Sequence, residues 1–433
     1  MYFPFIVAAI SYVFGFLLHK AYGNEVLKKI LVWSGSLALL GLLGYYKYTN
    51  FFLEQWSSFR NTEFTALTII VPLGISYYIF KAMSYVFDMY YERIEQPILN
   101  PLYFSLYILF FPTVQLGPLD RADEFTEQLK VEPVFTKQLV GSAVLLLITG
   151  LIKKAIVADY LGINFVDRVF DSPLKFTGVE NLMALYAYTI QFYCDFSGYT
   201  DLALGVGLLL GIKIRDNFNF PYKADSLAEF WRRWHMSFSA WLLDYLFTPL
   251  QLTFRRMRNY GTALALFITF VLCGLWHGAS MMFILWGAAH GGIMAVSFLT
   301  QKFRKNTITK MGLGGSKILH FLRVVFTFHL VTSLWILFRS PSLEIAGDVV
   351  SQITTYFKPE VLQQFVFDGY GSIVLTMLLG LTTMLFPKFA AEKGKELFLK
   401  MPEFLYPLLL ALVIYISIQV RSADLVPFIY FQF

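Results

Sequence analysis

The chain has 433 residues, of which 57% are hydrophobic and only 15% are charged, and its mean hydropathy is +0.58. This composition is too apolar for a soluble protein of that length, so we expect a protein embedded in a lipid bilayer. A net charge of +6 favours contact with anionic lipid over nucleic acid, because no basic soluble domain is visible in the sequence.

Crossing the hydrocarbon as a helix takes roughly 20 mostly apolar residues, and such stretches recur along the chain. We count about eleven, near 3–19, 31–48, 65–87, 98–117, 138–158, 179–195, 262–275, 280–299, 318–338, 370–387 and 402–420. The segment 198–211 is expected to be re-entrant or a further crossing. Broken helices at membrane depth indicate an internal cavity, because lipid cannot satisfy free backbone groups. We interpret residues 1–433 as a single all-α, polytopic membrane domain.

Basic residues between the apolar stretches predict an orientation. Lys20, Lys28 and Lys29 place the first loop in the cytoplasm, and alternation of the spans then places Lys153 and Lys154 on the same side. The first apolar stretch has neither a basic leader nor a cleavage site, so it is interpreted as a retained helix. The N-terminus is therefore expected to face outward.

Polar residues interrupt one apolar run, which contains Asp195, Ser197, Tyr199 and Asp201. A charge at mid-bilayer costs about 2.5 to 3.5 kcal/mol on insertion scales, so this cluster is expected to face a cavity or a partner. Two interpretations are equally favoured. Either hydrogen bonds within the cluster bend a helix, or the cluster takes part directly in the reaction.

Aromatic and apolar residues recur at helical spacing from Phe230 to Tyr245, which predicts an interfacial or cavity-lining amphipathic helix. Anchoring at the membrane–water boundary is sufficient to explain Trp231 and Trp241. Arg232 and Arg233 are placed to reach lipid headgroups or an anionic ligand.

Two histidines in tryptophan-containing apolar surroundings are the strongest candidates for chemistry. His235 lies in Trp-Arg-Arg-Trp-His-Met-Ser, at the border between the apolar and basic faces of the predicted helix, and His277 lies in Gly-Leu-Trp-His-Gly. A neutral imidazole in such a setting is a ready proton acceptor near neutral pH. A lone histidine on an apolar face is more often a structural core residue, and this applies more strongly to His290.

The sequence lacks the patterns of two rival chemistries. No His-Glu-x-x-His pair is present for a hydrolytic zinc site, and no Gly-x-Ser-x-Gly motif is present for a serine nucleophile. Cys194 and Cys273 both lie in apolar runs and are expected to be small buried side chains. Direct transfer of a chemical group with the assistance of a histidine remains as the favoured chemistry.

Several further motifs accompany the segments around His235 and His277. They are Pro72–Ser76, Gly117–Arg121, Gly150–Lys154, Asp195–Tyr199, Asp216–Tyr222 and Trp286–Gly291. Together they cover most of the chain and resemble the membrane-bound O-acyltransferase family, in particular its bacterial branch of alginate O-acetyltransferases and teichoic-acid D-alanyltransferases. Gln251–Arg255 departs from the alginate-type pattern, whereas Gly117–Arg121 is closer to the D-alanyl branch.

The resemblance implies a bundle of about eleven transmembrane helices, with re-entrant and interfacial helices, around a central tunnel. It also implies that His277 is the principal catalytic histidine and His235 the second. Supporting or substrate-binding roles are expected for Arg232, Arg233, Trp276, Asp195, Ser197 and Tyr199. Neither a metal nor a bound cofactor is expected. The acyl donor is expected to be a thioester, either acyl-CoA or an acyl carrier protein.

We hypothesise that a bacterial, multi-pass protein of the cytoplasmic membrane transfers an acyl group from a cytoplasmic donor to a hydroxyl of an extracytoplasmic polysaccharide or envelope glycan. Acetyl is favoured, and D-alanyl transfer to teichoic acid is the alternative. His277 is expected to take the acceptor proton, and His235 to hydrogen-bond the developing oxyanion or to orient the donor carbonyl. An extracytoplasmic transferase is a possible partner.

Two other classes of function remain open. A proton-coupled transporter would use Asp195, Asp201, His235 and His277 as a proton relay, although the inverted halves typical of transporters are not visible. A scaffold for a partner complex is less favoured, because ionisable groups inside the membrane would then be unfavourable and without purpose. Movement of a substrate across the membrane without formation of a covalent product would distinguish a transporter from an enzyme.

Overall fold

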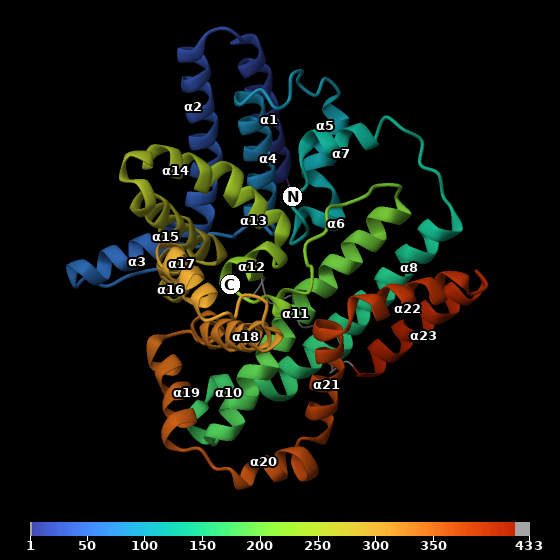
Figure 1. The fold of residues 1–433 in the computed structure, drawn as a ribbon. Coiled ribbons are helices and arrows are strands. Elements are labelled where there is room, and N and C mark those ends of the chain that lie inside the picture. The colour runs from blue at the N-terminus through green and yellow to red at the C-terminus, as the bar shows by residue number, and fades with distance from the viewer. Residues whose placement is uncertain (1, 421–433) are drawn as a thin grey trace. The chain divides into compact units, whose positions relative to one another are not determined.

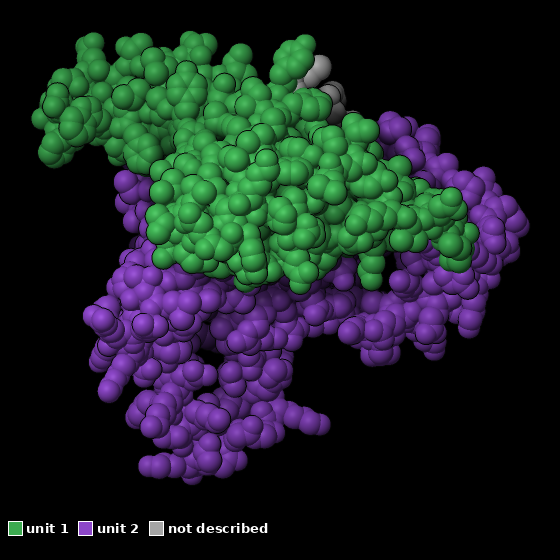
Figure 2. Space-filling model, turned by 90° about the horizontal axis from the view of Figure 1, so that it is seen from above, with its two compact units in different colours: residues 1–136, 206–215, 278–280 green, residues 137–205, 216–277, 281–433 purple. Residues whose placement is uncertain are grey.

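The computed structural model describes residues 2–420, and these form helices and connecting segments without a β-strand (Figure 1). The helices pack into two compact units, which Figure 2 distinguishes by colour. Unit 1 comprises residues 1–136, 206–215 and 278–280, and unit 2 comprises residues 137–205, 216–277 and 281–433. The expectation of a single domain stays a prediction.

Unit 1 holds seven helices and the C-terminal end of an eighth. They are α1 (Phe3–Lys20), α2 (Glu25–Leu43), α3 (Thr49–Arg60), α4 (Ile75–Tyr90), α5 (Pro101–Leu109), α6 (Phe111–Val114) and α7 (Ala122–Gln128), followed by the end of α11 (Gly178–Leu209). A π-helical turn, Gly44–Tyr48, joins α2 to α3. Helices α1, α2 and α4 pack side by side (Figure 1). Phe5, Ile6, Trp33 and Leu37 are exposed, as is expected of side chains that meet lipid.

Unit 2 holds the remaining helices. They are α8 (Lys137–Leu151), α9 (Asp159–Leu161), α10 (Asp167–Asp171), most of α11, α12 (Leu227–Arg233), α13 (Met236–Leu242), α14 (Thr248–Thr253), α15 (Arg258–His277), α16 (Met281–Leu299), α17 (Gln301–Lys310), α18 (Lys317–Arg339), α19 (Leu343–Thr355), α20 (Glu360–Gln364), α21 (Gly371–Leu385), α22 (Lys388–Lys400) and α23 (Leu405–Val420). Helix α15 packs along α16, and α8 packs against α22 and α23 (Figure 1).

Short π and 3₁₀ turns connect many of these helices. The π turns are Ile152–Ala158, Gly162–Val166, Leu243–Phe247 and Phe365–Gly369, and the 3₁₀ turns are Pro173–Lys175, Pro221–Lys223 and Arg255–Met257. The first two π turns join α8, α9 and α10 into one helical path from Lys137 to Asp171.

Within residues 2–420, six helices are long and apolar enough to cross a membrane, and up to eight if each of two bent helix pairs counts as one span. This is fewer than the roughly eleven spans predicted by hydropathy. Two predicted spans differ from the structure for local reasons. Residues 65–74 are not helical, and α4 begins only after Gly74, whose φ of +75° favours glycine. The span at 98–117 is divided into α5 and the single turn α6.

The segment 198–211 is not re-entrant. Its first twelve residues continue α11, a helix of 32 residues that carries the polar cluster at 195–201 without interruption. Both cysteines, Cys194 on α11 and Cys273 on α15, are free and buried, as predicted.

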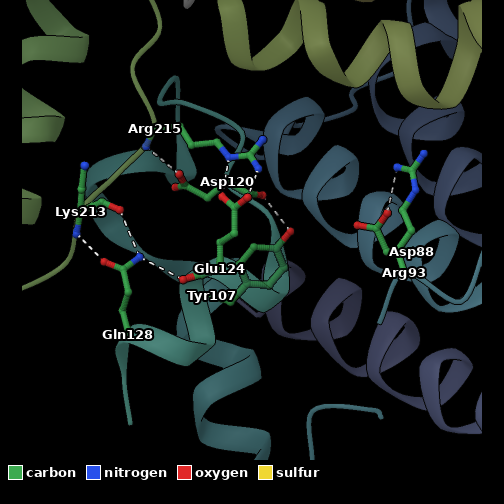
Figure 3. Close-up of polar contacts among 8 residues, drawn as sticks. All are labelled: Asp88, Arg93, Tyr107, Asp120, Glu124, Gln128, Lys213 and Arg215. Carbon is green, nitrogen blue, oxygen red and sulfur yellow. Dashed lines mark hydrogen bonds and ion pairs between the residues drawn. The ribbon is translucent and has the colours of Figure 1, made fainter. Parts of the chain in front are cut away.

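Hydrogen bonds fasten the segment after α11 within unit 1 (Figure 3). The guanidinium of Arg215 forms an ion pair with Glu124, with Nε 2.7 Å from Oε2, and its backbone N–H donates to Oδ1 of Asp120 across 3.1 Å. The Gln128 amide bonds both backbone groups of Lys213, at 2.8 and 3.2 Å. The motif Gly117–Arg121 therefore contributes Asp120 to the anchoring of this segment.

Candidate active site

His277 is the last residue of α15, and its side chain lies inside unit 2 with only 5% of its surface exposed. Aromatic rings surround the imidazole. The ring of Trp286 lies edge-on at 5.1 Å between ring centres and 88° between planes, and those of Trp276 and Phe338 lie at 5.0 and 5.2 Å. The imidazole is therefore enclosed by protein and does not face lipid.

Close packing of α15 against α16 creates this enclosure. A Cβ on Gly274 would lie 2.1 Å from the carbonyl oxygen of Phe283, and one on Gly287 would lie 2.2 Å from that of Phe270. Both positions therefore require glycine for the two backbones to approach this closely. The approach brings Trp286 of α16 against His277 of α15.

The helix predicted from Phe230 to Tyr245 is not continuous, because it breaks at His235. Helix α12 begins after Ser226, whose side chain accepts a bond from the backbone N–H of Glu229, and ends at Arg233. His235 has φ +45° and ψ +52°, a left-handed conformation, and α13 starts at the next residue. Such a backbone conformation is uncommon for a residue other than glycine and is often found at functional sites.

His235 is buried, and its ring has both a polar and an aromatic contact. Nδ1 lies 3.0 Å from Oδ1 of Asn217, and the ring stacks on Phe238 at 4.9 Å with Phe196 edge-on at 4.7 Å. Burial lowers the pKa of His235 to about 3, so the imidazole is neutral at physiological pH.

Phe238 connects the two candidate histidines. Its ring lies 4.9 Å from that of His235 and 6.2 Å from that of His277, and it stacks on Trp276 at 4.2 Å. The structure therefore brings His235 and His277 into one aromatic cluster, although α13, α14 and the length of α15 lie between them in the sequence. Trp276 belongs to the same cluster, and its supporting role stays a prediction.

Trp231 and Trp241 do not act as anchors at the membrane boundary, because both are buried within unit 2. The indole N–H of Trp231 donates to Nδ1 of His290 across 3.2 Å. The amphipathic pattern is real, but other helices cover the apolar face instead of lipid: Trp231 packs against α15 and α16, and Trp234 packs against α11 and α18. His290 is fully buried by the same packing.

The carboxylates of the polar cluster form ion pairs with lysines of the helical path 137–171. Lys154 Nζ lies 2.5 Å from Asp195 and 2.7 Å from Asp159, and Lys153 Nζ lies 2.7 Å from Asp201. Lys153 and Lys154 are thus paired inside unit 2, so they do not supply the loop charges assumed in the predicted orientation. That orientation stays a prediction.

Two of the cavities that open within unit 2 contain residues of the predicted site. One, of about 530 Å³, is lined by several hydroxyl side chains together with the Lys153–Asp201 pair and Asn217; its other lining residues include Ser197, Tyr193 and Thr200. Ser197 therefore lies at a cavity as expected, whereas Asp195 is held by Lys154. Tyr199 is half-buried on the same helix.

The second cavity, of about 930 Å³, is basic. Its lining includes Arg232, Arg304, Lys305 and Arg323, and none of its lining residues is an aspartate or glutamate. The two arginines predicted to act together differ in position. Both bond the carboxylate of Glu229, Arg232 at 3.3 Å and Arg233 at 2.8 Å, but Arg232 lines this cavity and is mostly exposed, whereas Arg233 is only one-third exposed.

Asn217 and Phe238 are two of the site residues that received no role in the sequence analysis. Asn217 lies inside the motif Asp216–Tyr222, and Phe238 lies in the apolar pattern of the predicted helix, so both were visible as parts of patterns. Neither pattern carries the information that these side chains contact His235. That contact depends on the chain reversing between residue 217 and α13.

The sequence is similar to those of several known proteins. The sequence model of the membrane-bound O-acyltransferase family matches residues 94–322. A probable alginate O-acetylase of Pseudomonas aeruginosa is 36% identical over 318 residues, which are 72% of this chain and 58% of that protein. A peptidoglycan O-acetyltransferase of Helicobacter pylori is 32% identical over 380 residues, which are 81% of this chain and 69% of that protein.

A teichoic acid D-alanyltransferase of Bacillus subtilis is 31% identical over 274 residues, which are 61% of this chain and 67% of that protein. The chain spans about 60% of the length of the alginate O-acetylases that it matches in Pseudomonas aeruginosa and Azotobacter vinelandii. The family match includes His235 and His277, and it covers more than half of the chain. With its apolar helices and buried histidines, the chain is a multi-pass membrane protein and belongs to the membrane-bound O-acyltransferase family.

Proposed function

We propose that this protein is an O-acyltransferase that moves an acyl group, with acetyl favoured, from a thioester donor on the cytoplasmic side to a hydroxyl of an extracytoplasmic polysaccharide. The observation that carries the proposal is the buried imidazole of His277, held in an aromatic cluster that also contains His235. Family membership and relatives named for acetyl transfer to alginate and peptidoglycan support the acetyl group and a glycan acceptor.

The proposed reaction is direct transfer. His277 takes the proton from the acceptor hydroxyl while the hydroxyl oxygen attacks the thioester carbonyl. The carbon–sulfur bond then breaks, and the thiolate leaves and takes up the proton from the imidazolium, which restores neutral His277. Enclosure by Trp276, Trp286 and Phe338 supports this role, because a dry site holds the reactants close and keeps water from competing for the acyl group. The tunnel that would admit both reactants stays a prediction.

The basic cavity suits the acyl donor. Acyl-CoA and the prosthetic arm of an acyl carrier protein both carry phosphate, which pairs favourably with arginine. Four basic side chains line the cavity and favour such an anion, although Arg232 and Arg323 also form ion pairs with Glu229 and Asp225 outside the lining. Arg232 is the member that lies nearest in sequence to His235. Arg233 is assigned to the ion pair with Glu229.

The smaller cavity suits a hydroxylated acceptor. Hydroxyl, amide and paired ionic side chains provide both hydrogen-bond donors and acceptors for a sugar, and Tyr193 provides an aromatic surface. We place the protein in the cytoplasmic membrane of a bacterium, where the donor and the glycan lie on opposite sides, and we infer that an extracytoplasmic transferase acts beside it.

D-alanyl transfer to teichoic acid is the second candidate, favoured by the similarity to teichoic acid D-alanyltransferases of Bacillus subtilis and Streptococcus thermophilus. The proposed histidine chemistry is the same for both acyl groups. An experiment must therefore identify both the acyl group and the acceptor polymer.

Mass spectrometry of purified envelope glycans tests the proposal. The native strain, a strain lacking the gene, and strains carrying His277→Ala or His329→Ala are compared, with the protein level in membranes measured in each. His329 is an exposed histidine on α18 and is the matched control. Loss of an acyl substituent in the deletion and His277→Ala strains alone is expected, and its mass identifies acetyl or alanyl. Normal acylation in the His277→Ala strain would refute the assigned role.

A further inference from the structure

The side-chain oxygen of Asn217 is the centre of a buried hydrogen-bond cluster. Oδ1 lies 3.0 Å from Nδ1 of His235, and it accepts from the hydroxyl of Ser237 at 2.9 Å and from the backbone N–H of Ser237 at 3.2 Å. All three residues are buried. A polar group is rarely taken out of water to this degree without a definite bonding arrangement.

The orientation of the Asn217 amide follows from its partners. A backbone N–H can only donate, so the atom that faces Ser237 must be the amide oxygen and not the amide nitrogen. The amide nitrogen has no hydrogen-bond partner within residues 2–420, so no competing contact favours the opposite orientation. Oδ1 therefore faces His235 as an acceptor, and Nδ1 of His235 must carry the proton.

Turning the imidazole over would lose its hydrogen bond, because the Cδ2–H group would then face Oδ1 of Asn217 in place of Nδ1. The backbone N–H of Met236 donates to the carbonyl of Asn217, and the N–H of Asn219 donates to that of Arg233, both at 2.9 Å. These two bonds tie the segment of Asn217 to the helix break that contains His235. Phe238 covers one face of the imidazole, and Phe196 meets it edge-on.

The charge state follows from the same environment. The His235 ring contacts the rings of Phe196, Phe238 and Trp276, and its Nδ1 bonds the amide of Asn217, which is uncharged. Burial among such groups disfavours the imidazolium, so the ring is neutral. A neutral imidazole has one proton, and because Asn217 places it on Nδ1, the lone pair lies on Nε2.

We propose that Asn217 is a positioning residue that holds His235 in the Nδ1–H tautomer, so that His235 presents a hydrogen-bond acceptor to the reactants. This replaces the oxyanion role expected from the sequence, because the lone pair on Nε2 would repel a developing oxyanion. A reactant O–H or N–H group beside the transferred acyl group is the partner that this nitrogen fits. The part concerning reactants rests on the proposed function, whereas the tautomer does not.

Nitrogen-15 NMR of histidine-labelled full-length protein in lipid nanodiscs tests the tautomer without reference to activity. The His235 signals are identified by their absence in His235→Gln. The native protein is expected to show a protonated Nδ1 and an unprotonated Nε2. Asn217→Leu should abolish this pattern, whereas Asn219→Leu, which changes an exposed asparagine two residues away, should preserve it. A protonated Nε2 in the native protein, or an unchanged pattern in Asn217→Leu, would overturn the proposal.

Asn217→Asp separates the acceptor role from the donor role. A carboxylate keeps the oxygen that faces Nδ1 and favours the imidazolium, so Nε2 gains a proton, which the same spectrum detects. Transfer measured on folded protein is then expected to fall about tenfold, as for the loss of one hydrogen bond to the reactants. Unchanged or faster transfer by a doubly protonated His235 would show that a donor is needed there and would refute the acceptor role. Failure of the proposed function is seen separately, as normal transfer by His277→Ala.

Discussion

The indole N–H of Trp231 donates a hydrogen bond to Nδ1 of His290 across 3.2 Å, inside the core of unit 2. The bond gives His290 a structural contact in the core. Since Nδ1 is occupied as an acceptor, the neutral imidazole carries its proton on Nε2. Helices α12 and α16 are joined by this bond.

Trp231→Phe is expected to lower the free energy of unfolding by about 1 to 3 kcal/mol, because it removes the donor while leaving the acceptor of His290 buried. Thermal unfolding of the purified protein in detergent micelles measures the change. Trp56→Phe, at an exposed tryptophan of α3, is the control and should have little effect. Equal stability of the two variants would argue against a structural role for the bond.

Gly274→Ala is expected to destabilise the packing of α15 on α16 by about 2 kcal/mol, because the added methyl would overlap the Phe283 carbonyl oxygen. Gly292→Ala is the matched control on α16, where nothing lies within 4 Å of the added carbon. That control should be neutral or slightly stabilising, since alanine has the higher helix propensity. The difference between their unfolding midpoints is the measured quantity, and similar midpoints would contradict the close approach.

Lys154→Met should cost more stability than Asp195→Asn. The lysine lies within 2.7 Å of both Asp159 and Asp195, so its removal leaves two buried carboxylates without the cation that they share, with an expected loss of about 3 kcal/mol or more. Asp195→Asn leaves Lys154 with Asp159. Thermal unfolding compares the two variants with Lys130→Met, an exposed control. A larger loss for Asp195→Asn would show that Asp195 has a role beyond this pair.

The Glu124–Arg215 pair predicts a small acid-sensitive contribution to the stability of unit 1. The hydrogen bond from Arg215 holds the pKa of Glu124 below its usual range. A carboxyl with a lowered folded-state pKa stabilises the fold above its unfolded pKa of about 4.3, and this contribution is lost as the pH falls through the folded value. The pair is half-exposed, so its contribution to the free energy of unfolding is below about 1 kcal/mol.

Unfolding midpoints of the native protein and Glu124→Gln should therefore differ at neutral pH and converge below about pH 4. Glu127→Gln on the same helix, which removes an exposed pair with Lys130, is the control. If the two midpoints instead converged as the pH rises, the pH dependence would have the opposite sign. The Glu124–Arg215 pair could then not be its cause.

Local patterns located the candidate histidines but not their surroundings. The Trp-His contexts of His235 and His277 were sufficient to select both residues. An ionisable group in an apolar run is energetically unfavourable, so it seldom occurs there without a function. The helical period from Phe230 to Tyr245 was correct on either side of His235 but wrong across it. A period of 3.6 describes the average of a segment and carries no signal for a single left-handed residue.

Composition and motifs alone established a membrane protein, the family that it resembles and the two histidines on which its chemistry is proposed to depend. Only the tertiary structure decided that Asn217 faces His235, that Lys154 neutralises Asp195, and that Trp231 turns inward to His290. Each of these contacts joins segments far apart in sequence. Burial makes such polar groups bond with whichever partner the packing of helices provides, and that packing is a property of the whole fold.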